Sequence, residues 1–278
     1  MIFATVLALS SAVLHAAWNL AIKQSPSDRY VALWGAFTIT APPTLVLAVL
    51  YPPNAASVPW AVVSGVAHVP YCWFLARGYN RGDYSIVYPI ARGGGAALGG
   101  IGGYLFLDDR LKPLGLVAVC VVVVGLLFLP ERQPGTNNTS AIISALMVAA
   151  TIATYSVADA KGIRTANSWR YTPVSFLAGS VAISIFGVML GKGPLMVEAT
   201  KRDWRQFVKV GSMSKATYAM VQFAMKLAPV GYVSALRESS VVLATVIGWR
   251  FLGESASRRR IACSSVVGLG LILLVISR

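Results

Sequence analysis

The chain has 278 residues, of which 56% are hydrophobic and only 12% are charged, and its mean hydropathy is +0.67. Soluble domains carry about a quarter charged residues, so this composition excludes an ordinary soluble protein and predicts a polytopic membrane protein. The net charge of +14 is scattered between apolar runs without a basic stripe, which favours anionic lipid headgroups over nucleic acid as its partner.

Ten apolar runs predict ten transmembrane helices, because roughly 20 apolar residues cross a bilayer. Charged residues or clusters of Pro and Gly bound each run. The eighth run is the weakest, since Lys209 and Lys215 lie within it. The longest predicted polar connections are 130–140 and 191–206. The predicted spans are 2–22, 30–50, 58–78, 83–107, 113–130, 140–160, 172–191, 206–227, 229–252 and 260–277.

The fourth predicted span, YSIVYPIARGGGAALGGIGGYLFL, carries a proline and an arginine near its middle. An arginine at the centre of a spanning helix costs about 2.5–3.5 kcal/mol, so Arg92 is expected to face a bundle interior or a water-filled cavity. Pro89 frees polar backbone groups beside that charge. Gly95, Gly99 and Gly103 recur every four residues, which lets a neighbouring helix approach closely. The span is therefore predicted to form the wall of a cavity.

An internal repeat divides the chain into residues 1–130 and 140–278, joined by a connection at 131–139. At an offset of 145 residues, Arg92 falls on Arg237 and Asp109 falls on Glu254. Each half contains five predicted spans, and an odd number inverts the second half relative to the first. Inverted repeats build two gates around a midplane site in many transporters.

These motifs resemble those of the drug/metabolite transporter superfamily, specifically its EamA-type ten-helix transporters. The resemblance extends over the whole chain and rests on HAAWN, GDYSIVYPIARG, FLDDRL, APVGYVSALRESS and FLGESAS. Asp109 stands where Glu is usual, which is a conservative departure. The resemblance implies an all-α bundle of two inverted five-helix repeats around a central cavity, and transport of small metabolites by alternating access. HAAWN and YPIARG are also similar, more weakly, to EamA-type permeases found alongside phosphonate-utilisation genes.

The two arginines at matching places in the repeats are the first candidates for substrate binding. Inversion would separate Arg92 and Arg237 by about 10 Å along the membrane normal, a spacing that suits a small anionic or zwitterionic molecule between two guanidinium groups. Alternatively, each arginine pairs with a buried carboxylate or caps broken backbone. Glu238 cannot pair with the adjacent Arg237, because consecutive helical positions do not face each other. It is therefore a candidate partner for another arginine, or a candidate proton-coupling group.

The first span offers a second polar stripe, because His15 and Asn19 share a helix face with Trp18 beside them. They are candidates for substrate binding, and His15 also for proton coupling. A simple hydrogen bond between helices explains the histidine equally well.

Asp159 is the counterpart of Asn19 in the second repeat, at a slightly smaller offset, and is a further proton-coupling candidate. The simpler interpretation is a surface anchor that Lys161 or Arg164 neutralises.

Among the aromatic residues, Tyr88 and Tyr155 join Trp18 as candidates to line the cavity. Most other aromatic side chains are expected in belts at the membrane interfaces. His68 in the third span is a weaker candidate.

The sequence thus predicts a secondary transporter, a permease or an exporter, for a small anionic or zwitterionic metabolite such as an amino acid or organic acid. We expect it in the inner (plasma) membrane of a bacterium, with the solute, protons and the lipid bilayer as partners and with no cofactor or metal; a homo-oligomer is left open. The alternatives are a flippase for a lipid-linked substrate, a phosphonate-related permease, or a membrane scaffold or enzyme. No HExxH or GxSxG pattern stands on any span, which argues against an enzyme. The resemblance implies cytoplasmic termini, whereas the Lys and Arg of the loops favour the reverse orientation.

Overall fold

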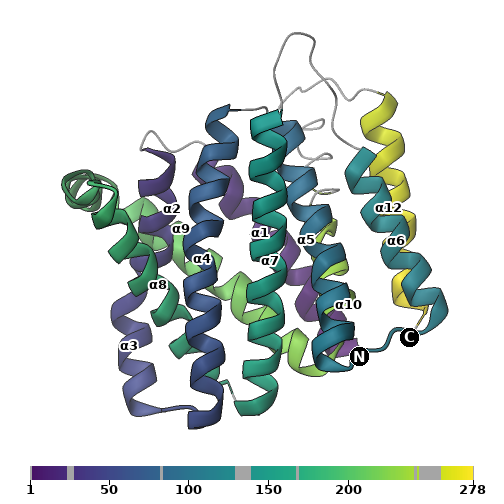
Figure 1. The fold of residues 1–278 in the computed structure, drawn as a ribbon, viewed down its shortest axis with the longest axis horizontal. Coiled ribbons are helices and arrows are strands. Elements are labelled where there is room, and N and C mark those ends of the chain that lie inside the picture. Colours follow the sequence, from purple (N-terminus) through teal and green to yellow (C-terminus); the bar gives the residue numbers. More distant parts are fainter. Residues whose placement is uncertain are drawn as a thin grey trace.

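The computed structural model describes residues 2–23, 28–81, 84–128, 139–166, 169–240, 243 and 258–277. Within these ranges the chain is helical and forms no strand, which confirms the all-α prediction. Most helices stand side by side in one bundle, and both termini lie at the same end of it (Figure 1). The helices are α1 (Ile2–Lys23), α2 (Arg29–Thr38), α3 (Ala41–Leu50), α4 (Val58–Arg81), α5 (Tyr84–Leu107), α6 (Pro113–Phe128), α7 (Thr139–Ala166), α8 (Tyr171–Met189), α9 (Gly193–Leu227), α10 (Val230–Arg237) and α12 (Arg258–Ile276), with a short 3-10 turn at Ala55–Ser57.

The outer surface of the bundle is apolar, as a bilayer requires. Leu105, Phe106 and Leu269 are each at least 64% exposed. Among the described residues, four stretches are long and apolar enough to cross a membrane, and three shorter helices are also apolar. The four stretches are Arg29–Leu50, Ala55–Gly78, Thr139–Ala166 and Tyr171–Met189.

The predicted second span, 30–50, is broken into α2 and α3. Asp28 caps α2, because its carboxylate accepts hydrogen bonds from the backbone N–H groups of Tyr30 and Val31 at 3.0 and 3.1 Å. Pro42 and Pro43 lie in the first turn of α3. Each proline lacks an N–H donor, so the hydrogen-bond ladder of α2 cannot continue through them.

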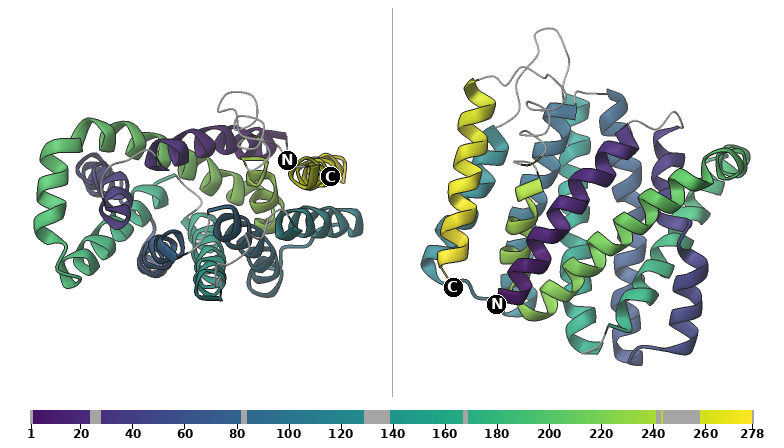
Figure 2. Two further views of the ribbon diagram at one scale, coloured as in Figure 1. Left: turned by 90° about the horizontal axis from the view of Figure 1, so that it is seen from above. Right: turned by 180° about the vertical axis from the view of Figure 1, so that it is seen from behind.

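The polar connection predicted at 191–206 is wrong, because α9 begins at Gly193. Pro194 suits the first turn of a helix, where its missing N–H would have no partner anyway. No further Pro or Gly follows until Gly211, so nothing in the sequence ends the helix. Figure 2 shows that the first turns of α9 lie at the edge of the bundle and that the helix then changes direction and runs obliquely beside α1.

The glycines of α5 allow two helices to approach closely, as predicted. A side-chain carbon at Gly95 would lie 2.7 Å from Ile152 of α7, and one at Gly103 would lie 3.2 Å from Val230 of α10. Both distances are shorter than van der Waals contact. The glycine face of α5 is therefore shared between α7 and α10.

A densely packed apolar cluster runs along the side of the bundle where the termini lie. It is contributed by α1, α6, α9, α10 and α12, with fully buried members that include Ala8, Leu126, Val221, Met225 and Leu236. The predicted ninth span begins here as α10; beyond residue 240 only residue 243 of it belongs to the described part.

Candidate functional site

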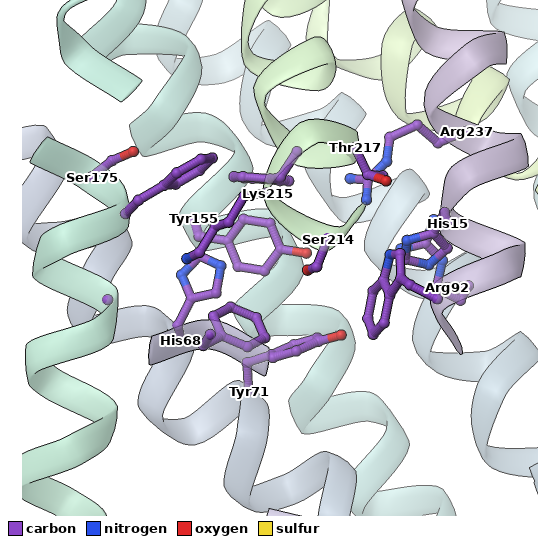
Figure 3. Close-up of a pocket in the computed structure, with 15 residues that line it drawn as sticks. His15, His68, Tyr71, Arg92, Tyr155, Ser175, Ser214, Lys215, Thr217 and Arg237 are labelled. Atoms are coloured by element: carbon purple, nitrogen blue, oxygen red, sulfur yellow. The ribbon is translucent and has the colours of Figure 1, made fainter. Parts of the chain in front are cut away.

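A cavity lies inside the bundle, lined by side chains from α1, α2, α4, α5, α7, α8, α9 and α10. It offers about 50 Å³ to the centres of water-sized molecules, several times the ~10–15 Å³ that one water needs. Its side chains form two groups (Figure 3). We call the group of His15, Arg92 and Arg237 the arginine end, and the group of Phe37, His68, Tyr71, Tyr155, Ser175, Phe176 and Lys215 the aromatic end.

The arginine end contains a buried ion pair between the two halves of the chain. Arg92 on α5 donates two hydrogen bonds to Glu238, from Nη2 to Oε1 at 2.6 Å and from Nε to Oε2 at 3.1 Å. The two side chains are only 6% and 3% exposed. Arg92 therefore lines the cavity and is also matched by a carboxylate, which sequence reasoning had treated as alternatives.

Arg237 is the last residue of α10 and is differently placed from Arg92. It is 4% exposed, and its guanidinium carbon lies 5.6 Å from the centre of the Tyr218 ring. It forms no ion pair with any carboxylate of the described residues, and its buried Nε has no hydrogen-bond partner among them. Its charge is therefore not matched by a carboxylate there.

On α1, His15 and Trp18 both line the cavity. Their rings meet edge to face, with centroids 5.0 Å apart. The side chains of the predicted Asn19 and Tyr88 lie outside the described part of the structure.

Stacked rings form the wall of the aromatic end. His68 of α4 stacks on Tyr155 of α7, with centroids 4.4 Å apart and planes 19° from parallel. A ring nitrogen of His68, Nδ1, hydrogen-bonds the backbone carbonyl of Ser64 at 2.7 Å. Tyr218 packs edge-on against both stacked rings and so connects the aromatic end with Arg237.

Asp159 is not a surface anchor, so the simpler interpretation of it is wrong. It is fully buried, and its carboxylate accepts hydrogen bonds from the hydroxyls of Tyr171 at 2.8 Å and Tyr218 at 2.5 Å. Neither expected cation neutralises it, because Lys161 is exposed and Arg164 binds Asp109 instead. Because Tyr218 lines the cavity, one hydrogen bond separates Asp159 from that space.

Arg164 and Asp109 form a second ion pair, which we call the clamp, at the end of the bundle that holds the termini. Arg164 donates to both carboxylate oxygens of Asp109, at 2.7 and 3.1 Å, and to the backbone carbonyls of Met225 and Ala228. Asp109 also accepts the N–H of Val230 at 2.8 Å. The clamp therefore joins the ends of α5, α7 and α9 to the start of α10.

Comparison with known proteins identifies the family. Residues 139–276 match the EamA-like transporter family. The chain therefore belongs to the EamA-like transporter family. The match covers the second predicted five-helix half, and it confirms the resemblance drawn from the sequence motifs.

Comparison with solved structures finds the same fold over nearly the whole length of this EamA-like transporter. Twenty-nine chains from solved structures match it. One is described only as "Crystal structure of protein"; it is 15% identical, has a TM-score of 0.74, and the alignment covers 98% of this chain and 97% of the other. At that identity the likeness shows the fold alone. No curated protein sequence matches the chain.

The cavity of this EamA-like transporter collects most of the side chains that the sequence proposed. Those that line it are His15, Trp18, Arg92, Tyr155 and Arg237. Glu238 lies behind Arg92, and Asp159 lies behind Tyr218. Among the described residues, no group of three or more His, Cys, Asp or Glu side chains could hold a metal.

Sequence reasoning missed Lys215, the cation of the aromatic end. Its Nζ lies 4.4 Å from the ring centre of Phe176 and 4.9 Å from that of Phe37. A signal was present in the sequence, because Ser214, Lys215 and Tyr218 lie within about one helical turn and place a cluster of polar groups inside the eighth predicted span. Lys209, the other lysine of the predicted eighth span, is exposed instead.

Proposed function

We propose that the chain is a secondary transporter that moves a small anionic or zwitterionic metabolite across the membrane by alternating access. The observation that carries this proposal is the charged cavity inside an apolar bundle. Arg92 comes from the first half of the chain and Arg237 from the second. A charge in the bilayer interior is costly, and it is kept where it serves a solute or ion pathway.

Two inverted five-helix repeats build the bundle in this proposal, and the pairing of helices supports them. Helix α4 packs against α7 and α8, and its counterpart α9 packs against α1 and α2. Likewise α5 packs against α7, and α10 packs against α1. If each helix is replaced by its counterpart in the other half, each of these contacts becomes another contact that the structure contains. The contact between α6 and α12 becomes itself, because these two helices are counterparts.

We assign the clamp as the closed gate of this conformation. It ties together helix ends from both halves, and the side chains of Met225 and Val230, whose backbone groups it binds, are fully buried. Access to the cavity from this end requires the hydrogen bonds of Arg164 to break.

Energy for uphill transport would come from an ion gradient or from the gradient of the solute, because the sequence contains no nucleotide-binding motif. Glu238, Asp159 and His15 remain the candidates for proton coupling. The contact of Asp159 with Tyr218 gives it a route to the cavity.

Uptake into proteoliposomes tests the proposal. Wild-type protein is expected to accumulate at least one member of a labelled mixture of organic acids and amino acids, relative to empty liposomes. Arg237→Gln should reduce this uptake about tenfold or more, since a charge-assisted hydrogen bond is worth ~1.5–3 kcal/mol. Arg205→Gln is the matched control, because Arg205 is exposed on the outer part of α9, and it should transport normally. Absence of uptake by the wild type, or normal uptake by Arg237→Gln, would contradict the proposal.

A further inference from the structure

We propose that the solute carries an acidic group at each end, as a small dicarboxylate does, and that Lys215 selects it over zwitterions. This inference rests on the proposed transport function and narrows its substrate class. It follows from the charges at the two ends of the cavity and from the partners that each of them already has.

Lys215 supplies the cation of the aromatic end. It forms no ion pair or hydrogen bond with the described residues, and its ammonium instead lies over the rings of Phe37 and Phe176. An ammonium held among apolar rings in a membrane is costly. An anion beside it offsets that cost, so this end favours an acidic group.

Arg237 supplies the second cation, at the arginine end. Its Nε is buried without a hydrogen-bond partner among the described residues, and Arg237 is one of the side chains that line the cavity. Buried polar groups are normally hydrogen-bonded. A carboxylate of the solute would provide the missing acceptor. Lys215 lies over Phe37 and Phe176, whereas Arg237 lies over Tyr218, so the two cations have different neighbours and we assign one acidic group of the solute to each.

The carboxylates near the cavity are already occupied, which disfavours a zwitterion. Glu238 accepts two hydrogen bonds from Arg92, and Asp159 accepts from Tyr171 and Tyr218. Three aromatic faces that could attract an ammonium by cation–π contact already meet a cation, because Phe37 and Phe176 lie against Lys215 and Tyr218 lies against Arg237. Whichever cation the carboxylate of an amino acid binds, its ammonium would therefore face the other cation, with no available carboxylate among the described residues.

Three solutes with similar four-carbon chains separate these classes: succinate is a dianion, butyrate a monoanion and 4-aminobutyrate a zwitterion. Their affinities are measured from the thermal stabilisation of the purified full-length protein at constant ionic strength, because a ligand that binds the folded state raises its melting temperature. Wild type should bind succinate about tenfold more tightly than butyrate, since the second charge-assisted contact is worth about that factor. Binding of 4-aminobutyrate should be the weakest.

Lys215→Gln should weaken succinate binding about tenfold and leave butyrate nearly unchanged, because only succinate needs both cations. Lys209→Gln alters an exposed lysine of the same helix and should bind all three solutes as the wild type does. Lys215→Arg keeps the charge and should keep the preference for succinate, which separates lost recognition from misfolding.

Equal binding of 4-aminobutyrate and succinate, an unchanged preference in Lys215→Gln, or no binding of any of the three would overturn the inference. If the proteoliposomes accumulate some other solute in those cases, the transport function stands and only the dianion assignment fails. If they accumulate none, the transport function fails as well.

Discussion

Replacing Glu238 with alanine is expected to destabilise the protein strongly and to abolish transport. The change leaves the guanidinium of Arg92, which is 6% exposed, without its carboxylate. Removing one partner of a buried ion pair typically costs about 3–5 kcal/mol, because the remaining charge stays buried. A lower melting temperature in detergent and a loss of uptake in proteoliposomes would report the two effects.

Glu198→Ala is the control for this experiment. Glu198 lies 3.9 Å from Arg202, but its side chain is 69% exposed, and exposed pairs contribute only about 0–1 kcal/mol. The double variant Arg92→Met with Glu238→Leu removes both charges and should recover much of the stability while transport stays absent. A wild-type melting temperature for Glu238→Ala would mean that the pair is not formed in the membrane protein.

Breaking the clamp with Arg164→Ala should loosen the end of the bundle where four helices meet. The variant loses two bonds to Asp109 and two to backbone carbonyls. Hydrogen bonds to charged groups are worth ~1.5–3 kcal/mol each when buried, and Arg164 is 26% exposed, so we expect a total at the low end of that range. Hydrogen exchange of the α10 peptide should therefore rise about tenfold or more, because 1.4 kcal/mol corresponds to a factor of ten. Uptake should slow, since alternating access requires this end to close.

Arg164→Lys should behave almost like Arg164→Ala, because an ammonium cannot reproduce the two-pronged contact of a guanidinium. Arg202→Ala serves as the control, since the Arg202 side chain is 53% exposed and its ion pairs lie in the opposite part of α9. If Arg164→Ala leaves both the hydrogen exchange of α10 and the uptake unchanged, the clamp is not a gate.

The surroundings of the charge in the fourth span could be predicted from the sequence, because a charge that faces lipid is energetically unfavourable. Arg92 had to face a cavity or a partner, and the structure gives it both. Its partner could not be predicted, because Glu238 is 146 residues away in sequence. The internal repeat indicated that position 237 matters, but it contained no information on which carboxylate meets which arginine.

Local spacing was misleading where a side chain turns toward a distant element. Arg164 lies close to Asp159 along the chain, yet it turns to Asp109, while two tyrosines satisfy Asp159. Lys215 made the eighth predicted span look weakly hydrophobic, because hydropathy counts a charge equally whether it faces lipid or a cavity. Hydropathy also missed the first turns of α9, because this part of the helix is polar and lies at the edge of the bundle.

Accessibility of a single cysteine inside the cavity tests the central claim most directly. Ser214 lines the cavity and is 8% exposed, so Ser214→Cys is introduced after replacement of Cys72, Cys120 and Cys263. A membrane-impermeant thiol reagent is then added from either side of sealed vesicles. Lys112→Cys and Arg81→Cys, at exposed positions near opposite ends of the bundle, mark the two sides. Alternating access predicts that each marker reacts from one side only and that Ser214→Cys reacts from both. Reaction of Ser214→Cys from one side alone, or from neither, would contradict the account.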